Sequence, residues 1–153
     1  MKKFNKNIAF LSFYGICLWG AILLSGSSEQ NPTEVKKTNK IEVDTIELVL
    51  DRILKLEGAH TFCIGDSGRS FGCFQITKDC LKDVNRRSGT NYTHSMMFDS
   101  IKARKVAKEY IFIGNENYRR KEGKEPTIEV MLRNYNGGAY SGYKNPKTKR
   151  YSK

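Results

Sequence analysis

The sequence has few of the residues that usually bind metals. It contains two histidines, His60 and His94, and four cysteines, none of them in a Cys-x-x-Cys pair. A structural zinc site needs closely spaced Cys and His ligands, so this composition argues against one, and no cofactor is expected. Only one long apolar run is present, which excludes a protein with several membrane spans. Internal repeats and low-complexity tracts are also lacking, so we expect one folded domain with short appendages.

The N-terminus has the layout of an export signal. Three lysines precede an uncharged apolar run at residues 8–24, and small residues follow at 25–28. This order predicts that residues 1–28 are a signal peptide and that the protein reaches the periplasm or the extracellular space. The run of 17 residues is also long enough for a retained membrane anchor. In that case residues 8–24 would be the only contact with the membrane.

The chain is strongly basic. Its 153 residues include 27 Lys and Arg against 16 Asp and Glu, a net charge of +11, and +8 remains without residues 1–28. A basic exported domain is attracted to polyanions such as cell-wall polymers, although the charge could equally serve solubility. The tail at residues 141–153 is basic and rich in tyrosine, but no nucleic-acid-binding motif accompanies it. Nucleic acid is therefore not expected as a partner, and we expect a monomer.

The remaining sequence divides into a linker and a domain. Residues 29–42 are polar and lack apolar periodicity, which predicts a flexible linker. The domain at 43–153 shows apolar residues at helical spacing in four segments, and a glycine-punctuated segment between the first two predicts a small hairpin or sheet. The expected fold is α+β and mostly helical, with helices near 45–57, 78–87, 99–120 and 126–135.

Glu57 is the first candidate for chemistry. It ends an apolar helix, at the negative end of the helix dipole, just before Gly58. Apolar neighbours and the dipole both disfavour the ionised carboxylate, and a raised pKa is what a general acid needs near neutral pH. A surface glutamate at a helix end is the simpler interpretation of this residue taken alone.

Two later segments offer groups that could bind a polar ligand. Gln75 has both a donor and an acceptor, and Phe74 could form the wall of a groove for a sugar. Tyr135 could support a buried acid, and Asn136 follows it before two glycines that would open space. In isolation, these segments could also be an ordinary strand with core aromatics and an ordinary helix end.

Together, in this order and spacing, the three segments resemble the lysozyme-like superfamily, in particular the family of lytic transglycosylases and goose-type lysozymes. The resemblance covers about residues 45–151, and the stretch at 64–69 is similar to a compact exported branch. It implies a lysozyme-like fold with a small β-hairpin or sheet beside an active-site cleft. The matching pieces are Leu56-Glu57-Gly58, Gly72-Cys73-Phe74-Gln75-Ile76 and Asn134-Tyr135-Asn136-Gly137-Gly138.

The resemblance also implies a substrate and a mechanism. The partner would be the glycan strands of peptidoglycan, cut at the β-1,4 bond between N-acetylmuramic acid and N-acetylglucosamine, with Glu57 as the catalytic acid. A lytic transglycosylase uses this glutamate alone, first as acid and then as base. A lysozyme-type hydrolase needs a second carboxylate, and Asp66 is the nearby candidate. Because Asp in Gly-Asp-Ser-Gly is also a typical turn residue, the transglycosylase is favoured.

Two further questions stay open at the level of sequence. A non-catalytic cell-wall-binding protein could share this fold, although the retained Glu57 counts against it. Three cysteines remain outside the export segment, and an oxidising compartment predicts one disulfide and one free thiol. A Cys63–Cys73 bridge would close the hairpin, whereas Cys73–Cys80 would tie it to the next helix. The pattern partly resembles invertebrate-type lysozymes, which carry a Cys-Gly-x-x-Gln-Ile segment and another Cys in the next helix, although Cys73 lies inside the Gly-x-x-Gln segment here.

Overall fold

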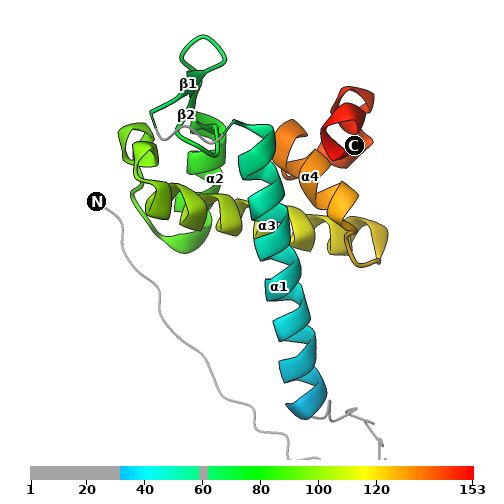
Figure 1. Cartoon of the computed structure of the whole chain (residues 1–153). Helices are drawn as coiled ribbons and strands as arrows, with labels where there is room; N and C mark the ends of the chain where they lie inside the picture. The colour runs from blue at the N-terminus through cyan, green and yellow to red at the C-terminus, as the bar shows by residue number, and fades with distance from the viewer. Residues whose placement is uncertain (1–31, 59–61) are drawn as a thin grey trace, which may run out of the picture. The chain divides into compact units, whose positions relative to one another are not determined.

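The computed structural model describes residues 32–58 and 62–153, and the side chains from residue 41 onward. The expected α+β, mostly helical class is confirmed (Figure 1). The signal peptide or anchor expected at 1–28 lies outside the described residues. Within the described part, no helix is both long and apolar enough to span a membrane. The elements of that part are α1 (Pro32–Leu56), β1 (Ile64–Gly65), β2 (Ser70–Phe71), β3 (Ile76–Thr77), α2 (Lys78–Ser88), η1 (His94–Phe98), α3 (Ser100–Glu122), α4 (Ile128–Gly137), η2 (Gly142–Lys144) and η3 (Pro146–Ser152).

Helix α1 begins at Pro32, well before the start expected near residue 44. Residues 32–42 are helical, where the sequence predicts a flexible linker over 29–42; residues 29–31 lie outside the described residues. Proline suits the first turn of a helix. Glu42 also pairs with Arg119 of α3 at 2.7 Å, a contact across 77 residues that holds this part of α1.

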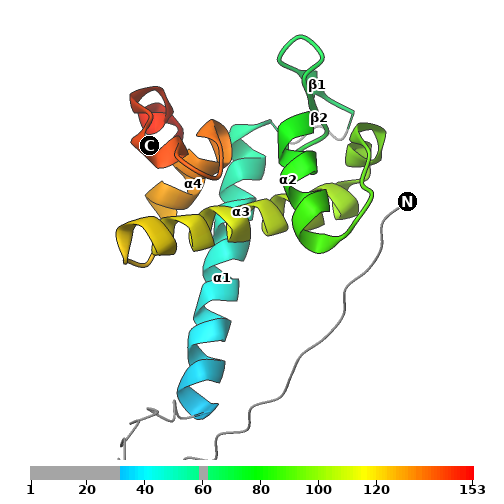
Figure 2. The ribbon, with the colours of Figure 1, turned by 180° about the vertical axis from the view of Figure 1, so that it is seen from behind.

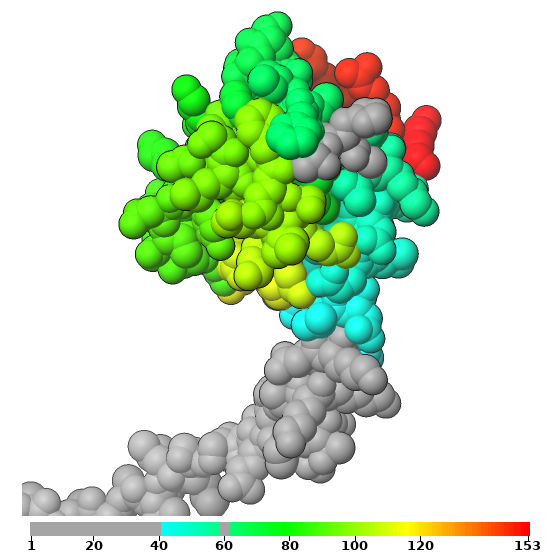
Figure 3. Space-filling model, turned by 60° about the vertical axis from the view of Figure 1, so that its left-hand side comes forward, coloured from blue at the N-terminus to red at the C-terminus, as the bar shows by residue number. Residues whose placement is uncertain are grey.

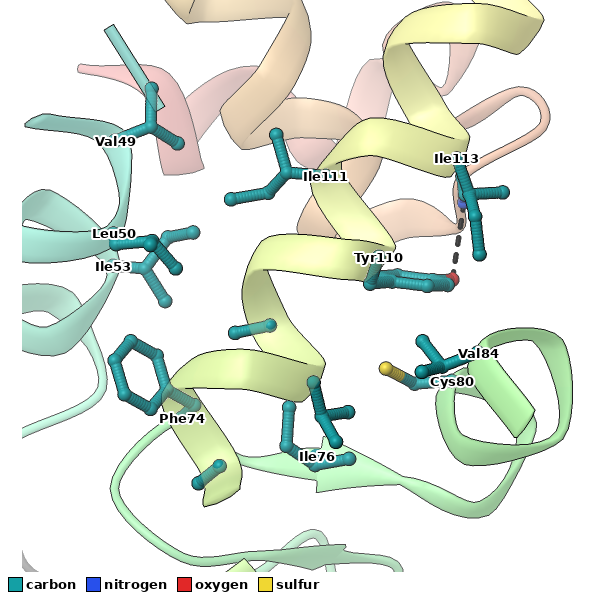
Figure 4. Packing of buried hydrophobic residues seen from close by; sticks show 14 of the residues in the cluster. Val49, Leu50, Ile53, Phe74, Ile76, Cys80, Val84, Tyr110, Ile111 and Ile113 are labelled. Carbon is teal, nitrogen blue, oxygen red and sulfur yellow. Dashed lines mark hydrogen bonds between the residues drawn. The ribbon is translucent and has the colours of Figure 1, made fainter. Parts of the chain in front are cut away.

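Helix α3 crosses α1 near the centre of the domain and forms the main core with it (Figures 1 and 2). Val49, Leu50 and Ile53 of α1 face Ile111 of α3, all within the buried cluster (Figure 4). Their spacing puts them on one helical face, as the sequence predicts. Helix α2 closes another side of the core through Val84, and α4 packs against α3. This packing fixes the C-terminal end of α1, where Glu57 lies.

The helix boundaries follow local capping chemistry. The Thr77 side chain accepts from the Cys80 N–H at the start of α2, and Asp99 accepts from the Ile101 and Lys102 N–H groups at the start of α3. Such side-chain acceptors satisfy N–H groups that lack partners within the helix. Gly89 ends α2 in the left-handed conformation that favours glycine. These ends agree with the sequence-based prediction to within one or two residues.

The sheet is a three-stranded antiparallel meander of two-residue strands. Ile64 pairs with Phe71, and Phe71 pairs in turn with Ile76. Gly72 lies between β2 and β3 with a φ of +74°, and a Cβ there would come within 1.9 Å of the Met97 carbonyl oxygen. Only glycine tolerates both the positive φ and the close approach. The sheet is thereby held tightly against η1, at the same end of the domain as Glu57.

The C-terminal residues form two 3₁₀ helices, η2 and η3, that pack on α4 (Figure 1). Thr148 in η3 is only 2% exposed, and its hydroxyl donates to the Gly142 carbonyl at 2.8 Å. The Arg52 guanidinium of α1 donates to the main-chain carbonyl of Lys153 at 3.1 Å. Residues 141–153, which look like a charged tail in the sequence, are therefore an ordered part of the domain.

Cys63, Cys73 and Cys80 are all free thiols in this structure, where the sequence predicts one disulfide. The two buried cysteines lie in different surroundings. Cys80 packs beside Val84 and Tyr110 (Figure 4), whereas Cys73 lines a groove beside Leu54 and Arg104 on the α1 side. Burial raises the pKa of both thiols, so they remain protonated at neutral pH.

Replacing Gly72 with Ala tests the close approach of the sheet to η1. We expect a loss of about 2–5 kcal/mol in the free energy of unfolding, from the positive φ and the clash with the Met97 carbonyl. Gly89→Ala is the control, because its φ is +63° but no atom lies within 4 Å of the added Cβ; about 1–2 kcal/mol is expected. Urea denaturation measures both, and equal losses would contradict the packing argument.

Candidate active site

The carboxyl group of Glu57 stands at the end of the apolar face of α1. The Glu57 main-chain N–H donates to the Ile53 carbonyl at 2.9 Å and closes the last turn of the helix. Gly58, with a φ of +81°, then directs the chain out of the helix, as the sequence predicts. The Glu57 side chain is half-buried. The β1–β2 hairpin and η3, shown in red, lie at one end of the molecule in Figure 3, and Glu57 interacts with Asp66 of the hairpin and with Tyr151 of η3.

Tyr151 of η3 is the hydrogen-bond partner of Glu57. Its hydroxyl donates to Glu57 Oε1 at 2.6 Å across 94 residues of sequence. Burial, followed by this hydrogen bond, raises the pKa of Tyr151, so the phenol remains protonated and acts as a donor. The bond fixes the direction in which the carboxyl group points.

The pKa of Glu57 is raised, as expected from its apolar surroundings. Burial is the largest cause, because it disfavours the charged form. The hydrogen bond from Tyr151 partly opposes this rise, and the negative charge of Asp66 adds to it. A carboxyl group in this state holds its proton to higher pH than a surface glutamate does. It can therefore act as a general acid closer to neutral pH.

Tyr135 and Phe74 have roles that differ from those expected. The Tyr135 hydroxyl donates to the main-chain carbonyl of Phe74 at 2.7 Å, and Tyr151 takes the role of supporting the acid. Burial, with a smaller contribution from the charge of Glu57, raises the pKa of Tyr135 well above its usual value. The Phe74 side chain is 2% exposed and belongs to the core, so its ring packs within the domain. Tyr135 thus ties α4 to the sheet beside Glu57.

Gln75 adopts a strained backbone conformation with a φ of +47°. Its Oε1 accepts from the Ser70 hydroxyl at 2.7 Å, and its Nε2 donates to the Gly72 carbonyl at 2.8 Å. Gly65 makes room for this amide, since a Cβ there would lie 1.9 Å from Gln75 Oε1. One N–H and one lone pair of the amide remain for a ligand. Strain of this kind, held by its surroundings, is common at functional sites.

Two hollows meet along the start of α2. The first, here called the Tyr135 hollow, has a volume of about 250 Å³ and includes Gln75, Tyr135 and Asn136 in its lining. The second, the Asp66 hollow, measures about 470 Å³ and also contains Arg69. Both are lined by Thr77 and Asp79, so they form neighbouring parts of one groove, and Glu57 is not among the residues that line it. Their combined size is that of a typical ligand site.

Asp66 lies in the turn between β1 and β2. It is exposed and has a φ of +50°, and its main-chain carbonyl accepts from the Arg69 Nε at 3.0 Å. Aspartate tolerates this left-handed conformation better than most residues, which agrees with its interpretation as a turn residue. The charge of Asp66 nevertheless acts on Glu57, so the two carboxylates lie within electrostatic reach of each other.

The structure thus brings together most of the residues singled out from sequence. Glu57, Gln75 and Tyr135 gather at one end of the domain, with Asn136 in the same hollow as Gln75 and Asp66 in the next. Tyr151 was missed, because the only sequence signal was a tyrosine-rich basic tail. In the described ranges, no three His, Cys, Asp or Glu side chains gather as a metal site would require. No family model, curated protein or solved structure matches the chain.

The raised pKa of Glu57 predicts how stability varies with pH. The folded state holds the Glu57 proton more tightly than the unfolded state does. The contribution of this group to the free energy of unfolding is therefore fully present below the usual pKa of 4.5, and it is lost as the pH rises through the raised pKa of the folded state. Glu57→Gln removes the titration. We expect the variant to gain stability relative to the wild type as pH increases through this window, measured by urea denaturation across pH 3–8. A stability difference that is independent of pH would contradict the assignment.

Removing the Tyr151 hydroxyl tests the hydrogen bond directly. Tyr151→Phe should raise the pKa of Glu57 further, because the bond favours the ionised carboxylate. The pKa can be measured by NMR titration of the Glu57 side-chain carbon. Tyr118→Phe is the control, since the Tyr118 hydroxyl makes no hydrogen bond within the described part of the chain. An unchanged or lower Glu57 pKa in Tyr151→Phe would show that the bond does not act on this carboxylate.

Proposed function

We propose that this protein is an exported lytic transglycosylase with a lysozyme-like fold that cleaves the glycan strands of peptidoglycan. The observation that carries the proposal is the half-buried Glu57 carboxyl group at the end of an apolar helix, with a raised pKa and a hydrogen bond from Tyr151. The order of the Glu57, Gln75 and Tyr135 segments, through its resemblance to that family, supplies the substrate.

The surroundings of Glu57 support a role as the acid. Because burial raises its pKa, the carboxyl group keeps its proton to higher pH and can donate it to a glycosidic oxygen as the bond to the leaving sugar breaks. Acid assistance of this kind typically accelerates a reaction by about 10²- to 10⁴-fold. Tyr151 holds Oε1 at 2.6 Å, which leaves Oε2 to face a substrate. The resulting carboxylate can then take a proton back in the second step.

In the proposed second step, the C6 hydroxyl of muramic acid attacks C1 of the same sugar. Glu57 accepts the proton of that hydroxyl, and an anhydro ring forms. Water takes no part, and the carboxyl group returns to its protonated state. Gln75 and Asn136 would hold the sugar in the Tyr135 hollow, with the free donor and acceptor of the Gln75 amide directed at polar groups of the ligand.

A hydrolase is the second candidate, and one observation favours it. Asp66 lies in the neighbouring hollow and its charge acts on Glu57, so it could activate a water molecule. Its position as an exposed turn residue with positive φ supports the transglycosylase instead, because no hydrogen bond or ion pair among the described residues fixes the direction of its carboxylate.

Two substitutions test these roles on purified peptidoglycan with the full chain. Glu57→Gln keeps the shape and removes the proton, so we expect the cleavage rate to fall at least about 100-fold. Asp66→Asn should cleave at nearly the wild-type rate if one acid suffices, whereas a hydrolase would lose orders of magnitude.

The control is Glu109→Gln, which removes an acid from α3 away from the groove and should leave the rate unchanged. Circular dichroism must show that each variant is folded. Full activity in Glu57→Gln would rule out the proposed acid. A folded wild-type protein that binds the glycan without cutting it would instead indicate a wall-binding protein.

A further inference from the structure

A third hollow lies on η3 and is lined almost entirely by cations. It has a volume of about 470 Å³ and is formed by Pro146, Lys147, Lys149, Arg150 and Lys153. We call it the basic hollow. All four cationic residues are exposed, so a ligand can reach them from solvent. Several cations of the helices, by comparison, lie against acidic side chains.

Within the described residues, the four cations of the basic hollow form no ion pair. Arg87, Arg104 and Arg119, by contrast, each contact a glutamate. Like charges held close together repel one another, and an anion placed among them removes that repulsion. The basic hollow is therefore electrostatically suited to an anionic ligand.

The platform under these cations is well anchored. The Arg133 guanidinium donates to the Thr148 hydroxyl at 3.2 Å and to the Asn145 carbonyl at 3.3 Å, and Arg52 donates to the Lys153 carbonyl. The buried Thr148 fixes the middle of η3. Because their backbone is already ordered, the four cations lose less freedom on binding than those of a flexible tail would.

The basic hollow is also directly connected to Glu57. Tyr151, whose hydroxyl holds Glu57 at 2.6 Å, comes immediately after Lys149 and Arg150 in the same 3₁₀ helix. A ligand that contacts these two cations therefore lies on the segment that positions the acid.

We infer that the basic hollow binds carboxylate groups of the peptide stems that peptidoglycan carries on its muramic acid. The inference rests on the proposed function. The stem is attached to the same sugar whose bond Glu57 would cut, so its carboxylates are tethered to the site of cleavage. An extended stem reaches about 3.3–3.6 Å per residue, which is enough to run from the groove to a neighbouring element. Free phosphate polymers are not attached to the cleaved sugar in this way, so the stem carboxylates are the favoured ligand.

The first test compares two glycans with the full chain: peptide-bearing peptidoglycan, and strands stripped of their stems by an amidase. The variant K149Q/R150Q removes two cations and keeps polar side chains of similar length. We expect its cleavage rate to fall about 5- to 30-fold on peptide-bearing glycan, as for two partly exposed ion pairs, and to be unchanged on stripped glycan. The control K82Q/K105Q removes the same charge from exposed positions on α2 and α3 and should match the wild type on both.

The second test measures binding without catalysis. By NMR titration of the full chain, an acidic stem peptide with free carboxylates should shift signals of η3, and its fully amidated counterpart should not. K149Q/R150Q should lose the shifts. No shifts with the acidic peptide, or equal shifts with the amidated one, would overturn the inference. Binding of a polyphosphate chain but not of the peptide would also overturn it, in favour of a site for phosphate polymers.

These outcomes separate the two proposals. If the wild type cleaves both glycans but K149Q/R150Q is unaffected, the stem site is wrong and the transglycosylase stands. If the wild type cleaves neither glycan, the proposed function fails, and the peptide titration alone decides whether the basic hollow binds stems. If the cleavage rate of K149Q/R150Q falls equally on both glycans, the cations only attract the wall in general, and the inference is overturned.

Discussion

The hydrogen bond between Tyr151 and Glu57 connects the end of the first helix to the last ordered segment of the chain. Its formation requires η3 to pack on α4, which depends on the buried Thr148 and on the closeness of Gly137 to Gly142. That packing also keeps Tyr151 directed at the half-buried carboxyl group. The chemical state of Glu57 therefore depends on residues nearly a hundred positions away in sequence.

Several features near Glu57 cost stability. The ionised form of the acid is disfavoured by burial, and Asp66, Ser67 and Gln75 all have positive φ values. Each such feature is held in place by its neighbours, as the Gln75 amide is by Ser70 and Gly72. A concentration of strain and a perturbed acid in one region is typical of sites under functional constraint. The rest of the domain, with capped helices and an apolar core, stabilises them.

Local signals were sufficient to predict α2, α3 and α4, because Thr77, Asp99 and Gly89 cap helices through contacts with near neighbours. The turn at Asp66 and the position of Glu57 were predictable for the same reason. The start of α1 was not, since it is held by the distant contact between Glu42 and Arg119. Tyr151 and the internal bonds of Gln75 depend on tertiary packing, and Phe74 proved to be a core residue. The sequence indicated Glu57 as a candidate but not Tyr151, which orients its carboxyl group.

The central claim is that Glu57 alone cleaves the glycan, and mass spectrometry of the products tests it most directly. Purified peptidoglycan would be incubated with the folded full chain and the released fragments weighed. The account predicts fragments that end in 1,6-anhydro-muramic acid, lighter by one water than the products of hydrolysis. Fragments with reducing ends would contradict it, because water activation by a second group would then be required. Glycan left uncut by the folded protein would contradict the enzymatic role itself.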